Sequence, residues 1–224
     1  MSNTRNFKQL SRDQIAGRAA RDIPNGAYVN LGIGIPTKIA RFISEEKTVF
    51  FHSENGVIGF EEADDGVHDP DLINAGKTAI RLLKGASLFH HADSFAMMRG
   101  GHVDMCFLGA LQIAANGDLA NWSTGQPDDV PSVGGAMDLV VGVRNVMVLT
   151  HHCTREGAPK LVEQCSYPLT ARGVVSRVYT DLAVLDIIKA SFVVREMVPG
   201  LTREELQDMT GAPLSFSDDL QDLA

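Results

Sequence analysis

Residues 27–59, AYVNLGIGIPTKIARFISEEKTVFFHSENGVIG, decide the fold class. The first five of them predict a buried strand that ends in a glycine turn, and Pro36 then opens a predicted helix that runs through residue 43. Residues 48–51 predict a second strand, which runs into the turn HSENG at 52–56. Strand, glycine turn, helix and strand follow each other as they do in a βαβ unit. We therefore expect an α/β fold whose open, mostly parallel sheet is flanked by helices.

Local patterns predict further elements along the chain. The capping box Ser11–Gln14 begins a helix that the turn at 24–26 ends, and a second capping box, Thr202–Glu205, begins a helix that ends near Gly211. Between these helices we expect a surface loop at 61–71, a short helix at 94–98, strands at 103–108 and 146–149, and three antiparallel strands within 173–198. Because no repeat or linker divides the chain, we expect residues 1–224 to form a single domain with a frayed acidic tail at 217–224.

The composition excludes several classes of protein. The 224 residues include 20 basic and 28 acidic ones, and the net charge of −8 leaves no positive face for nucleic acid. The longest apolar stretch, 139–149, is interrupted by an arginine and an asparagine, so it is too short to span a bilayer. The cysteines form no CxxC pair and fit a reducing compartment: Cys106, Cys153 and Cys165. We expect a cytoplasmic protein that binds neither nucleic acid nor membranes.

Two glycine-bearing loops, 30–37 and 53–59, follow the two predicted strands. In open α/β sheets, ligands gather beyond the carboxyl ends of the strands. The second loop places Glu54 directly after an apolar strand, and the following Asn55-Gly56 allows the sharp turn that would present the carboxylate there. A carboxylate at this position can act as a general base or as a covalent nucleophile. The alternative is that Glu54 caps the next segment or forms a surface ion pair.

Glycine turns offer two further kinds of site. The pair Gly32 and Gly34 resembles part of a dinucleotide-binding fingerprint, but Thr37 stands where GxGxxG requires its third glycine. The segment Gly134–Asp138 is a second glycine cluster, whose backbone N–H groups could stabilise an oxyanion. An ordinary tight turn that enters a helix or strand explains that cluster equally well.

Other polar side chains have weaker claims to a site. Three cations after the acidic loop either bind phosphate or form a solvated face: Lys77, Arg81 and Lys84. Three histidines have apolar or glycine neighbours, which favours packing over acid–base catalysis: His90, His91 and His102. The run His151-His152-Cys153 has no second cluster at zinc-ligand spacing, so we expect no metal site.

Several segments together resemble the B (β) subunit of the 3-oxoacid CoA-transferases. They are YVNLGIGIPT (28–37), SENGVIG (53–59), DLINAGK (71–77), ADSFAMMRGGHVD (92–104), LGALQ (108–112), GDLANW (117–122), GGAMDLV (134–140) and PLT (168–170). The resemblance runs from about residue 10 to residue 210 and implies the CoA-transferase (NagB/RpiA-like) fold. Two pairs, His90-His91 and Tyr167-Pro168, favour the 3-oxoadipate:succinyl-CoA branch over the acetoacetate branch.

The resemblance implies a ping-pong transfer of CoA from succinyl-CoA to a 3-oxoacid. Glu54, which matches the family's nucleophile, would attack the thioester carbonyl and then carry CoA as a glutamyl thioester. The Gly135 and Ala136 amides match the family's oxyanion hole. The CoA thioester is a substrate, so the resemblance implies no cofactor and no metal. An acyl-CoA hydrolase on the same scaffold, or a non-catalytic binding module, is the alternative.

The resemblance also assigns substrate contacts and a partner. Asn30 would face the acyl and carboxylate groups, and Lys77 would contact CoA. The remaining substrate- or CoA-binding positions are glycines and the turn asparagine: Gly32, Gly34, Asn55, Gly56 and Gly134. One departure concerns Phe60-Glu61-Glu62, which replaces the family's usual Gly-Pro pair and puts the choice of oxoacid in question. The chain is expected to pair with a CoA-transferase A (α) subunit in an α2β2 heterotetramer, and alone to expose a large apolar face.

Overall fold

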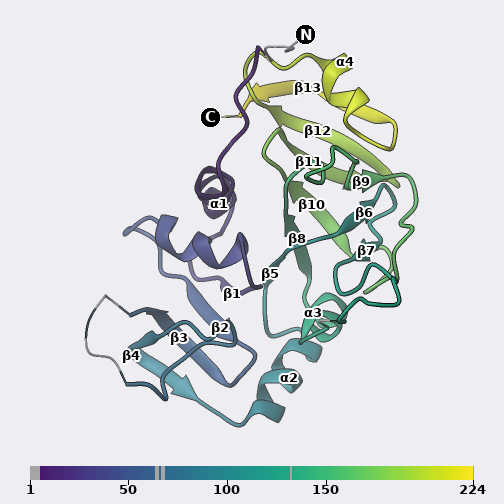
Figure 1. The fold of residues 1–224 in the computed structure, drawn as a ribbon. Helices are drawn as coiled ribbons and strands as arrows, with labels where there is room; N and C mark the ends of the chain where they lie inside the picture. The colour runs from purple at the N-terminus through teal and green to yellow at the C-terminus, as the bar shows by residue number, and fades with distance from the viewer. Residues whose placement is uncertain (1–5, 64–65, 67–68, 132, 224) are drawn as a thin grey trace.

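The computed structural model describes residues 6–63, 66, 69–131 and 133–223, and one large sheet organises them. Its strand order is β13-β12-β11-β10-β8-β5-β1-β2-β3-β4 (Figure 1). The five central strands, β10-β8-β5-β1-β2, are all parallel to their neighbours within this group. Antiparallel pairs extend both sides of this centre, and β13 is again parallel to β12. The expected open, mostly parallel α/β sheet is confirmed.

The strands have the following bounds. The central ones are β1 (Tyr28–Leu31), β2 (Phe50–Ser53), β5 (Met105–Leu108), β8 (Asn145–Leu149) and β10 (Val175–Tyr179), and the outer ones are β3 (Val57–Glu62), β4 (Ile80–Leu88), β11 (Ala183–Ile188), β12 (Ser191–Met197) and β13 (Leu214–Asp222). A small second sheet has the order β7-β6-β9, from Gln112–Ala114 (β6), Leu119–Ala120 (β7) and Leu161–Val162 (β9). All four side chains of β5 are buried, as expected for the middle of a parallel sheet covered on both faces.

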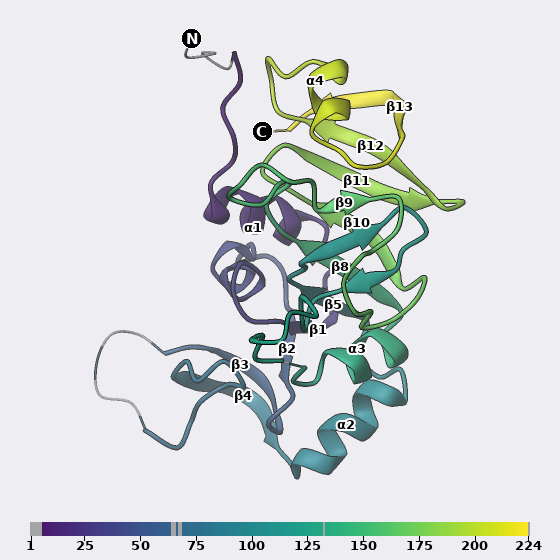
Figure 2. The same ribbon diagram turned by 45° about the vertical axis from the view of Figure 1, so that its right-hand side comes forward.

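Four α-helices and one 3-10 helix pack around the large sheet within the described residues. They are α1 (Arg12–Arg21), the 3-10 helix η1 (Pro36–Phe42), α2 (His91–Arg99), α3 (Ala136–Gly142) and α4 (Arg203–Asp208). Both predicted capping boxes are present, at the starts of α1 and α4. Figures 1 and 2 show α1 and η1 on one face of the large sheet and the small sheet on the other. Among the described residues, no helix is long and apolar enough to cross a bilayer.

The segment after the HSENG turn differs from the expectation. Residues 57–62 form β3, which returns antiparallel to β2, and β4 continues this antiparallel arrangement. The expected surface loop at 61–71 is therefore wrong at its start, since Glu61 and Glu62 belong to β3, and residues 64, 65, 67 and 68 lie outside the described part. The sequence did not indicate β4 because most of its side chains are exposed, which leaves no hydrophobic alternation.

The C-terminal segment is ordered rather than frayed. Residues 214–222 form β13 along the edge of β12, with Phe192 opposite Leu214 and Met197 opposite Asp222. Leu223 is only 2% exposed, and its N–H donates to the Met197 carbonyl. The expectation of a frayed tail is thus wrong for residues 217–223, because its acidic residues lie on an edge strand whose intervening apolar side chains pack on the core.

Candidate active site

A cavity of about 330 Å³ lies beyond the carboxyl ends of β1, β2 and β5, next to the start of α3. Its walls include Asn30 and Gly32 at the end of β1, Glu54 after β2, Gly109 after β5, and Gly134 and Gly135 before α3. The sheet topology explains this convergence, because parallel neighbours end at the same edge of a sheet. The cavity is therefore where the fold class predicts a ligand.

The hairpin turn between β2 and β3 presents Glu54 to this cavity. The Gly56 N–H donates to the Ser53 carbonyl at 3.0 Å, which closes the turn around Glu54. Gly56 has a φ of +108°, and a Cβ there would lie 2.2 Å from the Phe89 carbonyl oxygen. Only glycine satisfies both constraints, so this residue determines where the Glu54 backbone leaves the strand.

The Glu54 carboxylate lies against the second glycine cluster. A Cβ placed on Gly135 would be 2.0 Å from Glu54 Oε2, and one on Gly134 would be 4.0 Å from Oε1. Gly135 is the N-cap of α3, so the carboxylate lies at the start of that helix. The Ala136 N–H already donates a long 3.3 Å hydrogen bond to the Val133 carbonyl.

The first glycine loop packs directly on β5. The Gly32 N–H donates to the Phe107 carbonyl at 2.8 Å, and a Cβ on Gly32 would lie 2.9 Å from that same oxygen. Gly34 has a φ of +100°, and a Cβ there would meet no atom within 4 Å, so its role is to bend the loop rather than to form the cavity wall.

The loop that follows β3 is tied to the Glu54 turn. The Ala75 N–H donates to Ser53 Oγ at 2.9 Å, and the Asn55 side chain donates to the Ile73 carbonyl at 2.7 Å. Asn74, Ala75 and Gly76 line the cavity, and the exposed Lys77 follows them with a φ of +64°. Asn55 and Lys77 thus belong to the rim of the site rather than to the cavity wall.

The structure brings six of the ten predicted site residues together around the cavity. These six are Asn30, Gly32, Glu54, Gly134, Gly135 and Ala136. The other four shape the loops or lie at the rim: Gly34, Asn55, Gly56 and Lys77. The catalytic and binding roles of all ten stay predictions, since geometry alone assigns a place and not a reaction.

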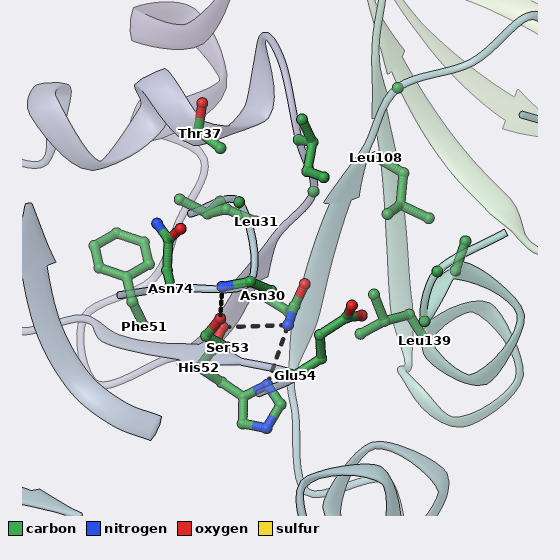
Figure 3. A pocket seen from close by; sticks show the side chains of 18 of the residues that line it. Asn30, Leu31, Thr37, Phe51, His52, Ser53, Glu54, Asn74, Leu108 and Leu139 are labelled. Atoms are coloured by element: carbon green, nitrogen blue, oxygen red, sulfur yellow. Dashed lines mark hydrogen bonds between the residues drawn. The ribbon is translucent and has the colours of Figure 1, made fainter. Parts of the chain in front are cut away.

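Sequence reasoning missed His52, a buried member of the site. His52 is 2% exposed. Its Nδ1 contacts the Asn30 side chain at 3.1 Å (Figure 3), and its Nε2 contacts Ser94 Oγ at 3.0 Å. Burial lowers the pKa of His52 to about 4, so its imidazole is neutral at pH 7. The feature of the sequence that could have indicated this residue is its position directly before Ser53-Glu54.

The wall formed by β3 carries the segment that departs from the family pattern. Phe60, Glu61 and Glu62 all line the cavity. Glu62 pairs with Arg41 at 2.8 Å, and Glu61 pairs with Arg81. Among the cations at 77, 81 and 84, Arg81 forms this pair on the exposed strand β4.

Three other histidines have structural roles. His90 caps α2 by accepting from the Ala92 N–H, and the ring of His91 packs on Phe95. His152 is buried, and its ring nitrogens contact the hydroxyls of Thr180 and Thr210 at 3.1 and 2.9 Å. In the described ranges of the chain, no three His, Cys, Asp or Glu side chains are grouped as metal ligands.

Comparison with known proteins identifies the family of this site. The coenzyme A transferase family model matches residues 12–208. The B subunit of 3-oxoadipate CoA-transferase from Acinetobacter baylyi is 57% identical over 93% of this chain and 96% of that protein. The B subunit of succinyl-CoA:3-ketoacid coenzyme A transferase from Helicobacter pylori (strain ATCC 700392 / 26695) is 44% identical over 90% of this chain and 97% of that protein.

Solved structures agree on the fold. An acyl-CoA transferase of Escherichia coli O157:H7 has a TM-score of 0.74 at 17% identity, covering 95% of this chain and 43% of that chain. The glutaconate coenzyme A-transferase of Acidaminococcus fermentans has a TM-score of 0.71 at 16% identity, covering 97% of this chain and 90% of that chain. The sequence matches decide the family: this chain belongs to the coenzyme A transferases, as a relative of their B subunits.

Proposed function

We propose that this chain is the B subunit of an enzyme that transfers CoA from succinyl-CoA to a 3-oxoacid, with 3-oxoadipate favoured and acetoacetate next. The observation that carries the proposal is the Glu54 carboxylate, which enters the cavity and lies against Gly135. A carboxylate beside backbone N–H groups has both a nucleophile and an oxyanion site within one pocket.

The proposed reaction is a ping-pong sequence of acyl transfers. Glu54 attacks the thioester carbonyl, and the CoA thiolate leaves to give a mixed anhydride of Glu54 and succinate. The thiolate then attacks the glutamyl carbonyl and releases succinate, so CoA is held on Glu54 as a thioester. The incoming oxoacid carboxylate reverses these two steps. Overall, one CoA thioester is exchanged for another of similar energy, so no ATP is required.

The surrounding residues have distinct parts in this scheme. The Gly135 amide, assisted by that of Ala136, donates to the oxyanion of each tetrahedral intermediate, where one lost donor typically costs roughly 3–4 kcal/mol. Asn30, Gly32 and Gly134 shape the wall next to Glu54. A carboxylate is a weak nucleophile towards a thioester, so binding of the remote CoA tail, to which Lys77 contributes at the rim, supplies the positioning energy.

The favoured acceptor follows from the relatives. Relatives named as B subunits of 3-oxoadipate CoA-transferase are 52–57% identical to this chain, and those named as B subunits of succinyl-CoA:3-ketoacid coenzyme A transferase are 44% identical or less. Their naming as B subunits supports pairing with an A (α) subunit, which we propose occurs in an α2β2 heterotetramer in the cytoplasm.

A transfer assay on the assembled enzyme tests the proposal. Succinyl-CoA and 3-oxoadipate should yield 3-oxoadipyl-CoA, and Glu54→Gln should reduce this rate to below a few per cent of wild type without unfolding the protein. Glu46→Gln, which changes an exposed glutamate in a turn, is the matched control and should keep the full rate. Release of free CoA without a new acyl-CoA would identify a hydrolase, and no reaction with either 3-oxoadipate or acetoacetate would favour a binding module.

A further inference from the structure

One wall of the cavity, on the side to which Glu54 points, carries Gly109 and Asn121. Figure 3 shows the Glu54 carboxylate directed toward the side formed by Leu108 and Leu139. Gly109 follows Leu108 along the chain, and Asn121 Nδ2 lies 3.3 Å from the Gly109 carbonyl oxygen. Because both residues also line the cavity, they belong to the wall that faces the reacting acid.

Two contacts fix the orientation of the Asn121 side-chain amide. The Gly109 carbonyl can only accept, so the amide atom that faces it is the nitrogen Nδ2. On the other side, the Thr170 hydroxyl accepts from the Asn121 backbone N–H at 3.2 Å and donates to Asn121 Oδ1 at 2.6 Å. Thr170 is only 9% exposed, so water competes little for these bonds. One Nδ2 hydrogen is bound to Gly109, and the second has no acceptor within the described part of the chain.

A second donor lies beside this amide, because the hydrogen-bond ladder between β1 and β5 stops at Gly109. The Gly32 N–H donates to the Phe107 carbonyl, and in a parallel ladder the Gly32 carbonyl would next accept from the Gly109 N–H. That bond is not formed, and among the described residues the Gly109 N–H has no other acceptor. A Cβ on Gly109 would meet no atom within 4 Å, so the open cavity reaches this backbone. The wall thus offers two neutral N–H donors, one from Gly109 and one from Asn121.

The charges around the cavity indicate which kind of ligand atom these donors suit. Among the described residues that line the cavity, none is a lysine or an arginine, and three are glutamates: Glu54, Glu61 and Glu62. Carboxylates are bound most strongly by cations, whereas two uncharged N–H groups suit an uncharged oxygen acceptor. The acceptor acid of the proposed reaction has such an atom, its 3-oxo oxygen. The carbon that bears it is two bonds from the reacting carboxyl carbon, so the 3-oxo group enters the cavity together with the carboxylate.

We propose that Gly109 and Asn121 bind the 3-oxo oxygen of the acceptor acid and so select 3-oxoacids over acids that lack this group. Thr170 is a positioning residue, because its hydroxyl acts on the substrate only through the Asn121 amide. The inference rests on the proposed function, since it concerns the acceptor of the same transfer. It also accounts for three segments to which the reaction scheme gives no part: LGALQ (108–112), GDLANW (117–122) and PLT (168–170).

Two acids that differ only in the 3-oxo group, 3-oxoadipate and adipate, test this inference on the assembled enzyme. Each serves as the acceptor of CoA from succinyl-CoA, and the reading is the ratio of kcat/KM for 3-oxoadipate to kcat/KM for adipate. A general loss of folded enzyme leaves this ratio unchanged, and any difference in the intrinsic reactivity of the two acids is the same for every variant. Asn121→Ala should lower the ratio about 3- to 10-fold, as expected for the loss of one neutral hydrogen bond.

Further variants distinguish positioning from packing. Thr170→Val should also lower the ratio, because the Asn121 amide is no longer held, whereas Thr170→Ser keeps the hydroxyl and should keep the ratio. Asn121→Asp has the shape of asparagine but lacks the N–H groups, so it should lower the ratio as well, and it covers the case in which Asn121→Ala does not fold.

The matched control is Asn145→Ala. The Asn145 amide likewise donates to a backbone carbonyl, that of Asp104, at 3.0 Å. Asn145 is exposed and lies at the start of β8, whereas the cavity lies beyond the carboxyl ends of the strands. This variant should therefore keep the wild-type ratio.

Three results would overturn the inference. The first is an unchanged ratio in a folded Asn121 variant, and the second is equal use of the two acids by wild-type enzyme. The third is a fall in the adipate-to-butyrate ratio of kcat/KM with an unchanged 3-oxoadipate-to-adipate ratio, which would assign the donors to the distal carboxylate. Failure of the proposed function looks different, because wild-type enzyme would then transfer CoA from succinyl-CoA to no acceptor, acetoacetate included.

Discussion

The carboxylate of Glu54 occupies the space where any side chain on Gly135 would have to begin. A Cβ on Gly135 would lie 2.0 Å from Glu54 Oε2 and 3.0 Å from its Cδ. The two residues come from a β-hairpin turn and a helix start that lie far apart in the sequence, and the fold brings them into contact. The absence of a side chain at Gly135 is what allows the acid to approach the start of α3.

Gly135→Ala should therefore remove activity and leave the fold intact. The methyl group meets the flexible end of Glu54, which can turn away, so we expect little loss of stability. The displaced carboxylate is no longer held where it attacks the thioester, so kcat should fall by about 100-fold or more. Gly17→Ala is the matched control, because its Cβ would make only a 3.4 Å contact with Phe42. Steady-state transfer rates and thermal melts measure both effects. A variant with near wild-type kcat would separate Gly135 from the chemistry.

The stability of the chain should fall between pH 6.5 and pH 4. Burial lowers the pKa values of both His52 and His152 to about 4, whereas an unfolded histidine titrates near 6.5. The unfolded state thus binds more protons in this window, so the stabilisation is complete above pH 6.5 and is lost as the pH falls. Each histidine should account for about 2 kcal/mol between pH 7 and pH 5.

Urea unfolding at pH 7 and pH 5 measures this difference. His152→Asn should lower the free energy of unfolding at both pH values, because it loses hydrogen bonds. It should also remove about half of the difference in the free energy of unfolding between pH 7 and pH 5. An equal pH dependence in the wild type and this variant would show that the buried imidazole of His152 does not titrate as described.

Glu62→Gln should shift the choice of acceptor towards dicarboxylic acids. Glu61 and Glu62 line the cavity together with Glu54, and Glu62 is compensated by an exposed Arg41 at 2.8 Å. Removing one of these negative charges reduces the repulsion of a second carboxylate on the acceptor, and a partly exposed pair is worth up to about 1 kcal/mol. We expect KM for 3-oxoadipate to fall about 3-fold while KM for acetoacetate changes less. Equal changes for both acceptors would place Glu62 outside the acyl pocket.

Removal of residues 214–224 should destabilise the protein. The deletion exposes the edge of β12 and takes away the apolar contacts of Phe216 and Leu223. Burial of one such side chain is worth about 1.5–3 kcal/mol, so the melting temperature should fall by at least about 5 °C. Asp218→Asn, on an exposed residue of the same strand, is the control for a change of charge alone. An unchanged melting temperature would mean that β13 contributes nothing to the folded state.

The sequence predicted the central part of the fold well because its signals there are local. Apolar runs mark β1, β2, β5 and β8, and the capping boxes mark the starts of α1 and α4. Glu54 could be singled out for the same reason, since a carboxylate followed by Asn-Gly after an apolar strand is a short pattern. Gly56 was recognised as a turn residue. Because glycine occurs both in hairpin turns and in turns from a strand to a helix, the sequence did not show that the strand β3 follows.

The remaining features depend on contacts that no local pattern contains. His52 lies within an apolar run, and its partners Asn30 and Ser94 are 22 and 42 residues away in the sequence. β4 is exposed along most of its length, and β13 carries acidic residues that resemble a solvated tail. These elements are stabilised by neighbouring strands rather than by their own composition, which is why the structure was needed to find them.

The most direct test of the central claim is to look for CoA on Glu54. The assembled enzyme is incubated with succinyl-CoA in the absence of an oxoacid, trapped at low pH, digested and analysed by mass spectrometry. We predict a CoA thioester on the peptide that contains Glu54, absent in Glu54→Gln and removed by adding 3-oxoadipate. CoA bound covalently only to another peptide or to the partner chain, or no adduct in an enzyme that transfers CoA at full rate, would contradict the account.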